Sequence, residues 1–232
     1  MSEKRFSKEQ AIRFGWQRMK DNLGFFIVYL LILFFIQGFL GFFSSMFAER
    51  IPSLSLIFSL GSWIVSLVSA IFVIKIGLKL YNNEKIVSYD FLSFSTALFF
   101  KFLLGYALYT ILVVIGFFLL VVPGVYLAIK YQFVQYLIVD KNMDVIDAFK
   151  ESGKMTDGYK WNLFLLVLLF LIIAALGAMA LGIGLLVAIP IIIVAQAYVY
   201  KKLCLNTVAQ SDILVANTGP SDNPFQPPTP SS

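Results

Sequence analysis

Long apolar stretches constrain this chain more than any other feature of its sequence. Six of them, each with few or no charged residues, lie at residues 23–43, 54–80, 98–122, 125–140, 161–181 and 183–205. About 20 apolar residues are needed to cross a hydrocarbon core of about 30 Å, so we interpret each stretch as a transmembrane helix. The second and sixth stretches are long enough to tilt or to extend into the interface.

The composition supports this interpretation. Of the 232 residues, 59% are hydrophobic and only 13% are charged, and the mean hydropathy is +0.86. A soluble domain usually has about 25% charged residues. We therefore expect an all-α fold, a polytopic membrane helix bundle with six transmembrane helices in three hairpins and with interfacial amphipathic helices. An amphipathic N-terminal helix over residues 1–22 precedes the bundle, and a disordered tail over residues 206–232 follows it.

The distribution of charge predicts the orientation. With both termini inside, the outer connections are residues 44–53, the Pro123-Gly124 turn and a turn near Gly182, and their charged residues are Glu49 and Arg50. Nearly all other charged residues lie in the N-terminal segment, in the two inner connections or at the inner ends of helices. This asymmetry follows the positive-inside rule. We expect a multi-pass protein of the plasma membrane with both termini in the cytoplasm.

A weak repeat places an amphipathic segment before each hairpin. The segments are SKEQAIRFGWQRMKDN, YDFLSFSTALFFK (89–101) and MDVIDAFKESGKMTDGYKW. The first and third have small residues four apart, Ala11 with Gly15 and Ala148 with Ser152. Such helices lie in the headgroup layer with their lysines toward anionic lipid. They either brace the inner face of the bundle or bind lipid or a partner protein, and an amphipathic pattern alone does not identify a ligand.

Lys130 lies inside the stretch 125–140, where a lysine costs about 2.5–3.5 kcal/mol on insertion scales. Its side chain either points back to the preceding turn and pairs the free carbonyls that end the third helix, or contacts a ligand. Tyr126 lies one turn before Lys130, and Gln132 and Gln135 follow it on another face. These four residues are the candidate ligand-binding residues. The two glutamines either line a polar cavity or form interhelical hydrogen bonds.

Four further lysines lie at the inner ends of the second and sixth helices, at Lys75, Lys79, Lys201 and Lys202. They either orient the helices by ordinary snorkelling, or form a site for the headgroup of an anionic lipid. The net charge of +5 fits both interpretations. Nucleic-acid binding is not expected, because it needs a solvated basic groove or a recognised module.

Catalytic, metal and cofactor sites are not expected either. The sequence contains no histidine and one cysteine, Cys204. These counts exclude the usual general base and a multi-thiolate metal site. Five serines share one stripe of the second helix, at Ser55, Ser59, Ser62, Ser66 and Ser69. A nucleophilic serine needs an adjacent base, whereas small residues on a stripe let two helix backbones approach closely.

Residues 119–164 carry a recognisable pattern. The pattern has two parts. The first is Pro-Gly-x-Tyr-Leu-Ala-x-basic-Tyr with an acidic residue at the end of the stretch, and it fits VVPGVYLAIKYQFVQYLIVD. The second is Ala-x-x-x-Ser-x-x-x-Thr-x-Gly, and it fits AFKESGKMTDGYKWNLF. This pattern resembles the membrane domain of certain glycerophosphoryl diester phosphodiesterases and related six-span prokaryotic proteins, with Gly153 where those proteins commonly have tryptophan. The resemblance implies a six-helix membrane fold. In those phosphodiesterases catalysis belongs to a separate soluble barrel, for which this chain has no room and no histidine.

We therefore expect a prokaryotic integral membrane protein that is not an enzyme, needs no cofactor and acts through lipid or membrane-protein contacts at the inner leaflet. It would serve as a scaffold, an anchor or an assembly factor, with membrane lipids, anionic ones among them, or a membrane protein as partner. The alternative is a small transporter or exporter component with a polar cavity around Lys130. Ion-coupled transport usually uses a carboxylate or histidine inside the bilayer, and the interior of the expected helices contains none.

The expected topology can be tested by cysteine labelling in intact cells. An impermeant maleimide should label Ser45→Cys, because residue 45 lies in an outer connection, and should not label Asn83→Cys or Thr218→Cys. The parent chain, with its single Cys204, is the control. Labelling of residue 218 from outside would overturn the topology with both termini in the cytoplasm.

Overall fold

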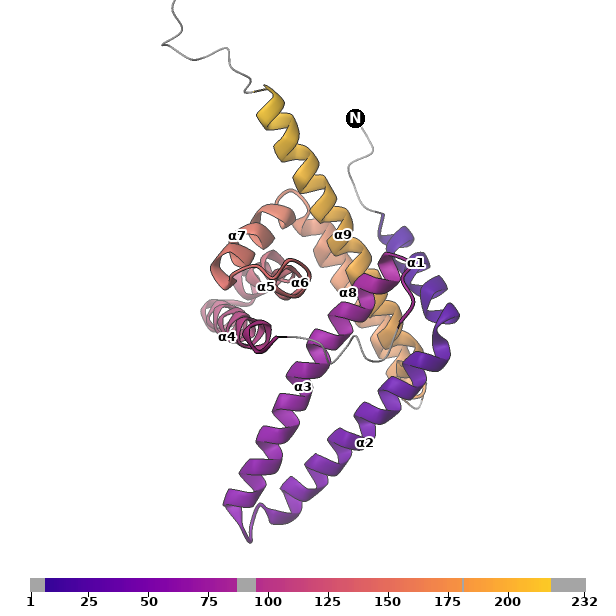
Figure 1. Ribbon diagram of the computed structural model, residues 1–232, viewed down its shortest axis with the longest axis vertical. Helices are drawn as coiled ribbons and strands as arrows, with labels where there is room; N and C mark the ends of the chain where they lie inside the picture. The colour runs from indigo at the N-terminus through magenta and orange to yellow at the C-terminus, as the bar shows by residue number, and fades with distance from the viewer. Residues whose placement is uncertain (1–6, 87–94, 181, 218–232) are drawn as a thin grey trace, which may run out of the picture.

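The computed structural model describes residues 7–86, 95–180 and 182–217, and these residues fold as helices joined by short connections (Figure 1). The helices are α1 (Lys8–Asp21), α2 (Leu23–Phe47), α3 (Pro52–Tyr81), α4 (Thr96–Leu119), α5 (Val121–Lys130), α6 (Val134–Lys141), α7 (Val145–Thr156), α8 (Lys160–Met179) and α9 (Leu185–Asn217). Five of them, α2, α3, α4, α8 and α9, are long and apolar enough to cross a membrane. The all-helical membrane fold predicted from the sequence is confirmed.

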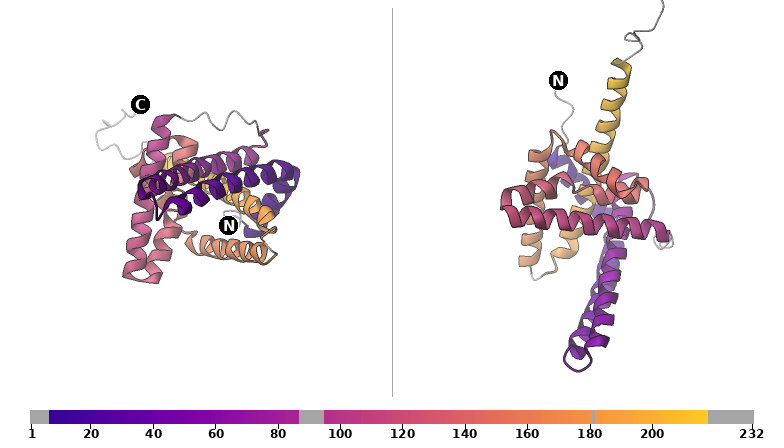
Figure 2. Two further views of the ribbon diagram at one scale, coloured as in Figure 1. Left: turned by 90° about the horizontal axis from the view of Figure 1, so that it is seen from below. Right: turned by 90° about the vertical axis from the view of Figure 1, so that its left-hand side faces the viewer.

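The helices pair in chain order. α2 packs on α3, α4 on α5 and α8 on α9, while α1 lies along α9 and α7 packs against α6 and α9. The α2–α3 pair projects away from the other helices, and α4 crosses its direction (Figures 1 and 2). The last turns of α9 extend beyond the rest at the opposite end (Figure 1). The amphipathic segments before the first and third hairpins are thus separate helices, α1 and α7.

The fourth expected transmembrane helix, over residues 125–140, is divided in the structure. α5 ends at Lys130 and α6 begins at Val134, and neither piece reaches the length of a membrane span. The Val134 N–H donates to the Tyr131 carbonyl at 3.2 Å, three residues back. The Lys130 carbonyl therefore loses its usual partner four residues ahead. Hydroxyl groups of α7 take that place, which explains why one continuous apolar stretch contains two helices.

The expected turn at Pro123-Gly124 also differs from the structure. Both residues lie in the first turns of α5, and the chain reverses at Leu120, whose backbone is extended. Proline is tolerated at this position because the first N–H groups of a helix have no partner inside it. Gly124 then approaches Gly116 of α4, where an added Cβ atom would lie 2.9 Å from the Gly124 Cα atom.

Two other expected boundaries shift. Of the amphipathic segment expected at 89–101, residues 89–94 lie outside the described residues, and residues 96–101 form the first turns of α4. α9 continues to Asn217, beyond the expected end at residue 205. The sequence has no glycine or proline between Pro190 and Gly219, so nothing in it interrupts the helix earlier. The rest of the expected tail, residues 218–232, lies outside the described residues.

α9 is the centre of the core. Its residues Val194, Ala195, Ala197, Val199, Tyr200 and Leu203 are fully buried between α1, α3, α7 and α8. α1 reaches α9 through its small residues Ala11 and Gly15, which are both buried. A Cβ atom added to Gly15 would lie only 2.6 Å from the Ile191 carbonyl oxygen. The absence of a side chain at this position therefore lets the two backbones touch.

The serine stripe of α3 faces α2 and bonds to it. The contacts join Tyr29 to Ser69, Gln37 to Ser62 and Ser66, and Ser44 to Ser55 and Ser59. Interhelical bonds of this kind contribute about 0.6 kcal/mol each in a membrane. The stripe thus holds the projecting hairpin together, and each of its hydroxyl groups is engaged in a structural contact.

We expect Gly15→Ala to destabilise the protein. The added methyl group must push α1 away from the Ile191 carbonyl, and overpacking of this kind costs about 1–3 kcal/mol. The midpoint of thermal unfolding in detergent should fall. Gly38→Ala in α2 is the matched control, because nothing lies within 4 Å of its added Cβ atom. Equal midpoints for the two variants would show that the α1–α9 contact does not contribute as described.

Candidate functional site

The end of α5 is held by α7. The Lys130 carbonyl oxygen accepts hydrogen bonds from the Ser152 hydroxyl at 3.0 Å and from the Thr156 hydroxyl at 3.1 Å. The Thr156 hydroxyl shares its one proton with the Ser152 carbonyl of its own helix, at 2.9 Å. Both donors lie one turn apart in α7, and both residues are fully buried. They occupy the Ser and Thr positions of the Ala-x-x-x-Ser-x-x-x-Thr pattern. A buried carbonyl at a helix end needs a partner, and these hydroxyls fix α7 across the end of α5.

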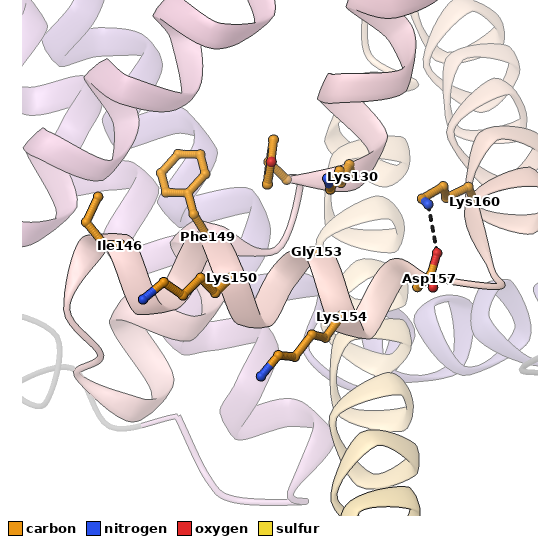
Figure 3. A pocket seen from close by; sticks show the side chains of 9 residues that line it. Lys130, Ile146, Phe149, Lys150, Gly153, Lys154, Asp157 and Lys160 are labelled. Carbon is orange, nitrogen blue, oxygen red and sulfur yellow. Dashed lines mark hydrogen bonds and ion pairs between the residues drawn. The ribbon is translucent and has the colours of Figure 1, made fainter.

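A cavity of about 520 Å³ lies between α5, α7 and the start of α8 (Figure 3). Its lining consists of Lys130, Tyr131, Ile146, Phe149, Lys150, Gly153, Lys154, Asp157 and Lys160. In Figure 3, Lys150 and Lys154 extend from α7 itself, while Lys130 and Lys160 come from the neighbouring segments. Four of the lining side chains are lysines and one is an aspartate, so the lining has an excess of three positive charges.

The Lys130 side chain does not pair the carbonyls at the end of α4, so that hypothesis is wrong. α4 and α5 are antiparallel, and the Tyr109 hydroxyl in the middle of α4 donates to the Ala128 carbonyl at 3.4 Å. Lys130 is ten residues along α5, so it lies about 15 Å from the turn that joins the two helices. A Cβ atom added to Gly153 would lie 3.3 Å from the Lys130 Cε atom. The lysine thus extends over α7.

Three of the cavity lysines have an acidic neighbour. The Nζ-to-oxygen distances are 2.8 Å for Lys160–Asp157, 3.2 Å for Lys150–Asp147 and 4.0 Å for Lys154–Glu151. The hydrogen bond and charge of Lys160, with a weaker contribution from the charge of Lys130, lower the pKa of Asp157. Lys130 itself is only partly exposed, and no ion pair joins it to a carboxylate in the described part of the chain. Its Nζ lies 5.2 Å from the Tyr131 ring centroid.

The other residues expected around Lys130 take separate positions. Tyr126 lies beside the cavity, with its ring centroid 5.0 Å from the Lys160 Nζ. Gln132 donates to a carbonyl at the end of α5 at 3.1 Å. Gln135 packs against α4, and its amide atoms are buried without a hydrogen-bond partner among the described residues. Tyr126 thus lies next to Lys160, and none of these three residues lines the Lys130 cavity.

A second charged cluster joins α6 to α9. The Lys201 Nζ lies 2.9 Å from both carboxylate oxygens of Asp140, and the Tyr200 hydroxyl donates to the same carboxylate at 2.8 Å. The Lys201 and Asp140 side chains are only 21% and 18% exposed. Removing one member of such a pair leaves a poorly solvated charge. Lys201, expected at a headgroup site, therefore has a structural partner.

The remaining lysines of the expected headgroup site divide into two places. Lys75 and Lys79 line a second cavity, of about 350 Å³, together with Asp140 and Glu84. Lys202 lies elsewhere, with its Nζ 5.8 Å from the Tyr198 ring centroid. Because two carboxylates line the second cavity beside its two lysines, the excess of positive charge is at the Lys130 cavity instead.

Sequence reasoning missed the side of the Lys130 cavity that α7 and α8 provide. Lys150 and Lys154 are four residues apart in an amphipathic segment, a spacing that places them on one helix face. That spacing was the available signal. The part of the chain that the structure describes has no group of three His, Cys, Asp or Glu side chains arranged to hold a metal ion. Four ammonium groups at one cavity are suited to binding an anion.

We expect the two α7 hydroxyls to substitute for one another at the Lys130 carbonyl. Ser152→Ala or Thr156→Val alone should have a small effect, whereas the double variant leaves a buried acceptor unpaired and should lose about 1–3 kcal/mol of unfolding free energy. Thr110→Val is the control, because among the described residues its hydroxyl bonds a carbonyl of its own helix, at 2.8 Å, and no other helix. Thermal unfolding in detergent measures the difference. A double variant as stable as the control would contradict this role of α7.

Comparison with known proteins gives one family. The family described as "Protein of unknown function (DUF975)" matches residues 54–207, from the first turn of α3 into the C-terminal half of α9. No curated protein and no solved structure matches the chain. The matched region contains both charged cavities and the α7 hydroxyls that hold α5. Because the match covers more than half of the 232 residues, the chain belongs to the DUF975 family.

Proposed function

We propose that the protein is a non-enzymatic component of the plasma membrane that acts by binding anionic lipid headgroups at the cytoplasmic face. Both termini lie on that face in this proposal. The function does not require catalysis, because the lysines that carry it need only hold a negative charge. The protein would thereby act as a scaffold or an anchor for assemblies on anionic regions of the membrane.

The placement of lysines along the apolar helices carries this proposal. Lys79 lies in the last turn of α3, and Lys101 and Lys160 lie near the starts of α4 and α8. Lys201 and Lys202 lie in the second half of the apolar part of α9, Leu185–Val208. The opposite ends of α4 and α8 have no basic residue in their last turns. In this proposal α5 and α6 together return the chain across the membrane after α4, so that three hairpins form and all these lysines fall on one side of the membrane. Lysines there attract anionic lipid, by about 1 kcal/mol for each residue near the surface.

The positions of the amphipathic helices α1 and α7 support the assignment of the lysines to the cytoplasmic side of the membrane. The turn between α2 and α3 lies at one end of the molecule, and α7 lies in the opposite half (Figure 1). α7 has exposed lysines at Lys150 and Lys154, and α1 has a cation over an exposed aromatic ring, with the Lys20 Nζ 5.8 Å from the Trp16 ring centroid. Tryptophan and lysine together are typical of helices in the headgroup layer.

One observation favours the transporter alternative. Helices that break at membrane depth often form substrate sites, and the apolar stretch 125–140 breaks after Lys130. Against this, neither Gln132 nor Gln135 lines the Lys130 cavity. The resemblance to the membrane domain of glycerophosphoryl diester phosphodiesterases is compatible with either role, since catalysis in those proteins belongs to another domain. We keep lipid binding as the first proposal.

Lipid retention tests the proposal. We expect Lys79→Gln/Lys202→Gln to retain less anionic lipid after mild detergent extraction, measured by mass spectrometry, because two ammonium groups on the proposed cytoplasmic face are lost. Lys201 is left in place, since its removal would leave Asp140 without its cation. Arg50→Gln, at the opposite end of the membrane helices, is the control and should retain lipid as the parent does.

Equal retention in parent, double variant and control would remove the lipid-binding role. A membrane protein that co-purifies in fixed proportion with the parent and is lost from the double variant, with lipid unchanged, would favour a protein partner instead.

A further inference from the structure

We infer that the cavity around Lys130 is a binding site for a phosphate monoester, carried by a membrane lipid headgroup or by a soluble phosphate ester. The inference deepens the proposed lipid-binding function by naming a site and a chemical class, and it can fail separately from it. Three observations carry it: an ammonium group without a carboxylate partner among the described residues, an open space beside that group, and a lining that is cationic in one part and apolar in another.

Lys130 provides the first observation. Its carbonyl is fixed by Ser152 and Thr156, so the base of the side chain has a defined position. The side chain is only partly exposed, and within residues 7–86, 95–180 and 182–217 no carboxylate pairs with it. A partly buried cation is costly unless an anion compensates it. A bound phosphate would supply the missing negative charge.

Gly153 provides the space. It lies in α7 directly beneath Lys130, and an added Cβ atom would already be 3.3 Å from the Lys130 Cε atom. Any larger side chain at this position would enter the cavity that both residues line. Glycine in the middle of a helix costs about 0.5–1 kcal/mol relative to alanine, so a packing or binding reason for it is expected. Close packing of the Lys130 side chain over this position is one such reason, and the cavity beside that side chain is another.

The charge of the lining indicates a monoester. Four lysines and one aspartate line the cavity, and a phosphate monoester carries about −1.5 to −2 charges at pH 7, whereas a diester carries one. Two of the lysines, Lys150 and Lys154, are 67% and 71% exposed and pair only with acids of their own helix. Exposed pairs contribute about 0–1 kcal/mol, so both side chains are free to turn to an incoming phosphate.

Lys160 and Asp157 line the cationic part of the cavity at the start of α8. Their ion pair is 2.8 Å long, and the Asp157 side chain is 75% exposed. A phosphate beside Lys130 would offer Lys160 a more highly charged acceptor than Asp157. The released carboxylate would then be solvated or would accept from a hydroxyl or amine of the ligand.

The apolar part of the lining indicates where the remainder of the ligand lies. Tyr131 and Phe149 pack together with ring centroids 5.0 Å apart, and Ile146 beside them is 58% exposed. All three line the cavity. A ligand that fits both parts has a phosphate at one end and carbon atoms at the other. The glycerol backbone of a phosphatidic acid headgroup and the carbon chain of a small phosphate ester both have this form.

The test uses the full chain in detergent, with short-chain phosphatidic acid, short-chain phosphatidylglycerol and inorganic phosphate as probes. Binding is measured as the rise in the thermal unfolding midpoint and by titration. We expect the parent to bind phosphatidic acid more tightly than phosphatidylglycerol. Lys130→Gln and Gly153→Leu should each weaken phosphatidic acid binding by about tenfold or more, since a charge-assisted contact or the space for it is lost. Arg50→Gln, in the connection between α2 and α3 and outside the cavity, is the control.

The three probes and the variants test the site, the monoester class and the source of the phosphate separately. Phosphatidic acid binding that is unchanged in Lys130→Gln and Gly153→Leu, at parental stability, would overturn the site while leaving general lipid binding intact. Equal affinity of the parent for the monoester and diester lipids would overturn the monoester class even if both variants failed to fold. A midpoint rise that inorganic phosphate reproduces in full assigns the site to soluble phosphate compounds, and a larger rise with phosphatidic acid assigns it to a lipid headgroup. Binding of none of the three probes by the parent would overturn the inference.

Discussion

Two hydroxyl groups of α7 determine how the middle of this protein is built. Ser152 and Thr156 both donate to the Lys130 carbonyl, and backbone groups inside an apolar environment must be paired within the protein. This pairing lets the apolar stretch 125–140 stop as one helix at Lys130 and restart at Val134. It also fixes the amphipathic helix α7 to the end of α5. The cavity between the two helices exists because of that attachment.

The rest of the fold depends on α9. Small side chains bring other helices onto it, Gly15 from α1 and Gly77 from α3, where an added Cβ atom would lie 2.6 Å and 2.9 Å from atoms of α9. The α2–α3 hairpin departs from this core, and its large apolar side chains, such as Phe34 at 72% and Phe35 at 70%, are exposed. Hydrogen bonds between the α3 serines and α2 hold it together. Exposed phenylalanines of this kind are suited to contact with lipid.

The sequence predicts the parts of this structure that depend on local composition. The five long apolar helices follow from hydropathy, and α1 and α7 follow from their amphipathic patterns, because each signal lies within the segment itself. The break after Lys130 does not follow, since it depends on hydroxyl groups 22 and 26 residues further along the chain. The Asp140–Lys201 ion pair could not be predicted either, because its two residues are 61 positions apart in the chain. At the site, the cost of a lysine in an apolar stretch identifies Lys130, whereas the opposite wall of the cavity, with Gly153 and the α7 lysines, depends on how α7 packs.

Together these features describe a membrane protein with a cationic, partly apolar cavity next to an amphipathic helix. A photoreactive phosphatidic acid, with its diazirine close to the phosphate, tests this account most directly. Added to membranes that contain the full chain and then irradiated, it should label the peptide over residues 145–160, and excess phosphatidic acid should suppress the labelling. Labelling confined to the ends of α3 and α9, with none in residues 145–160, would contradict it.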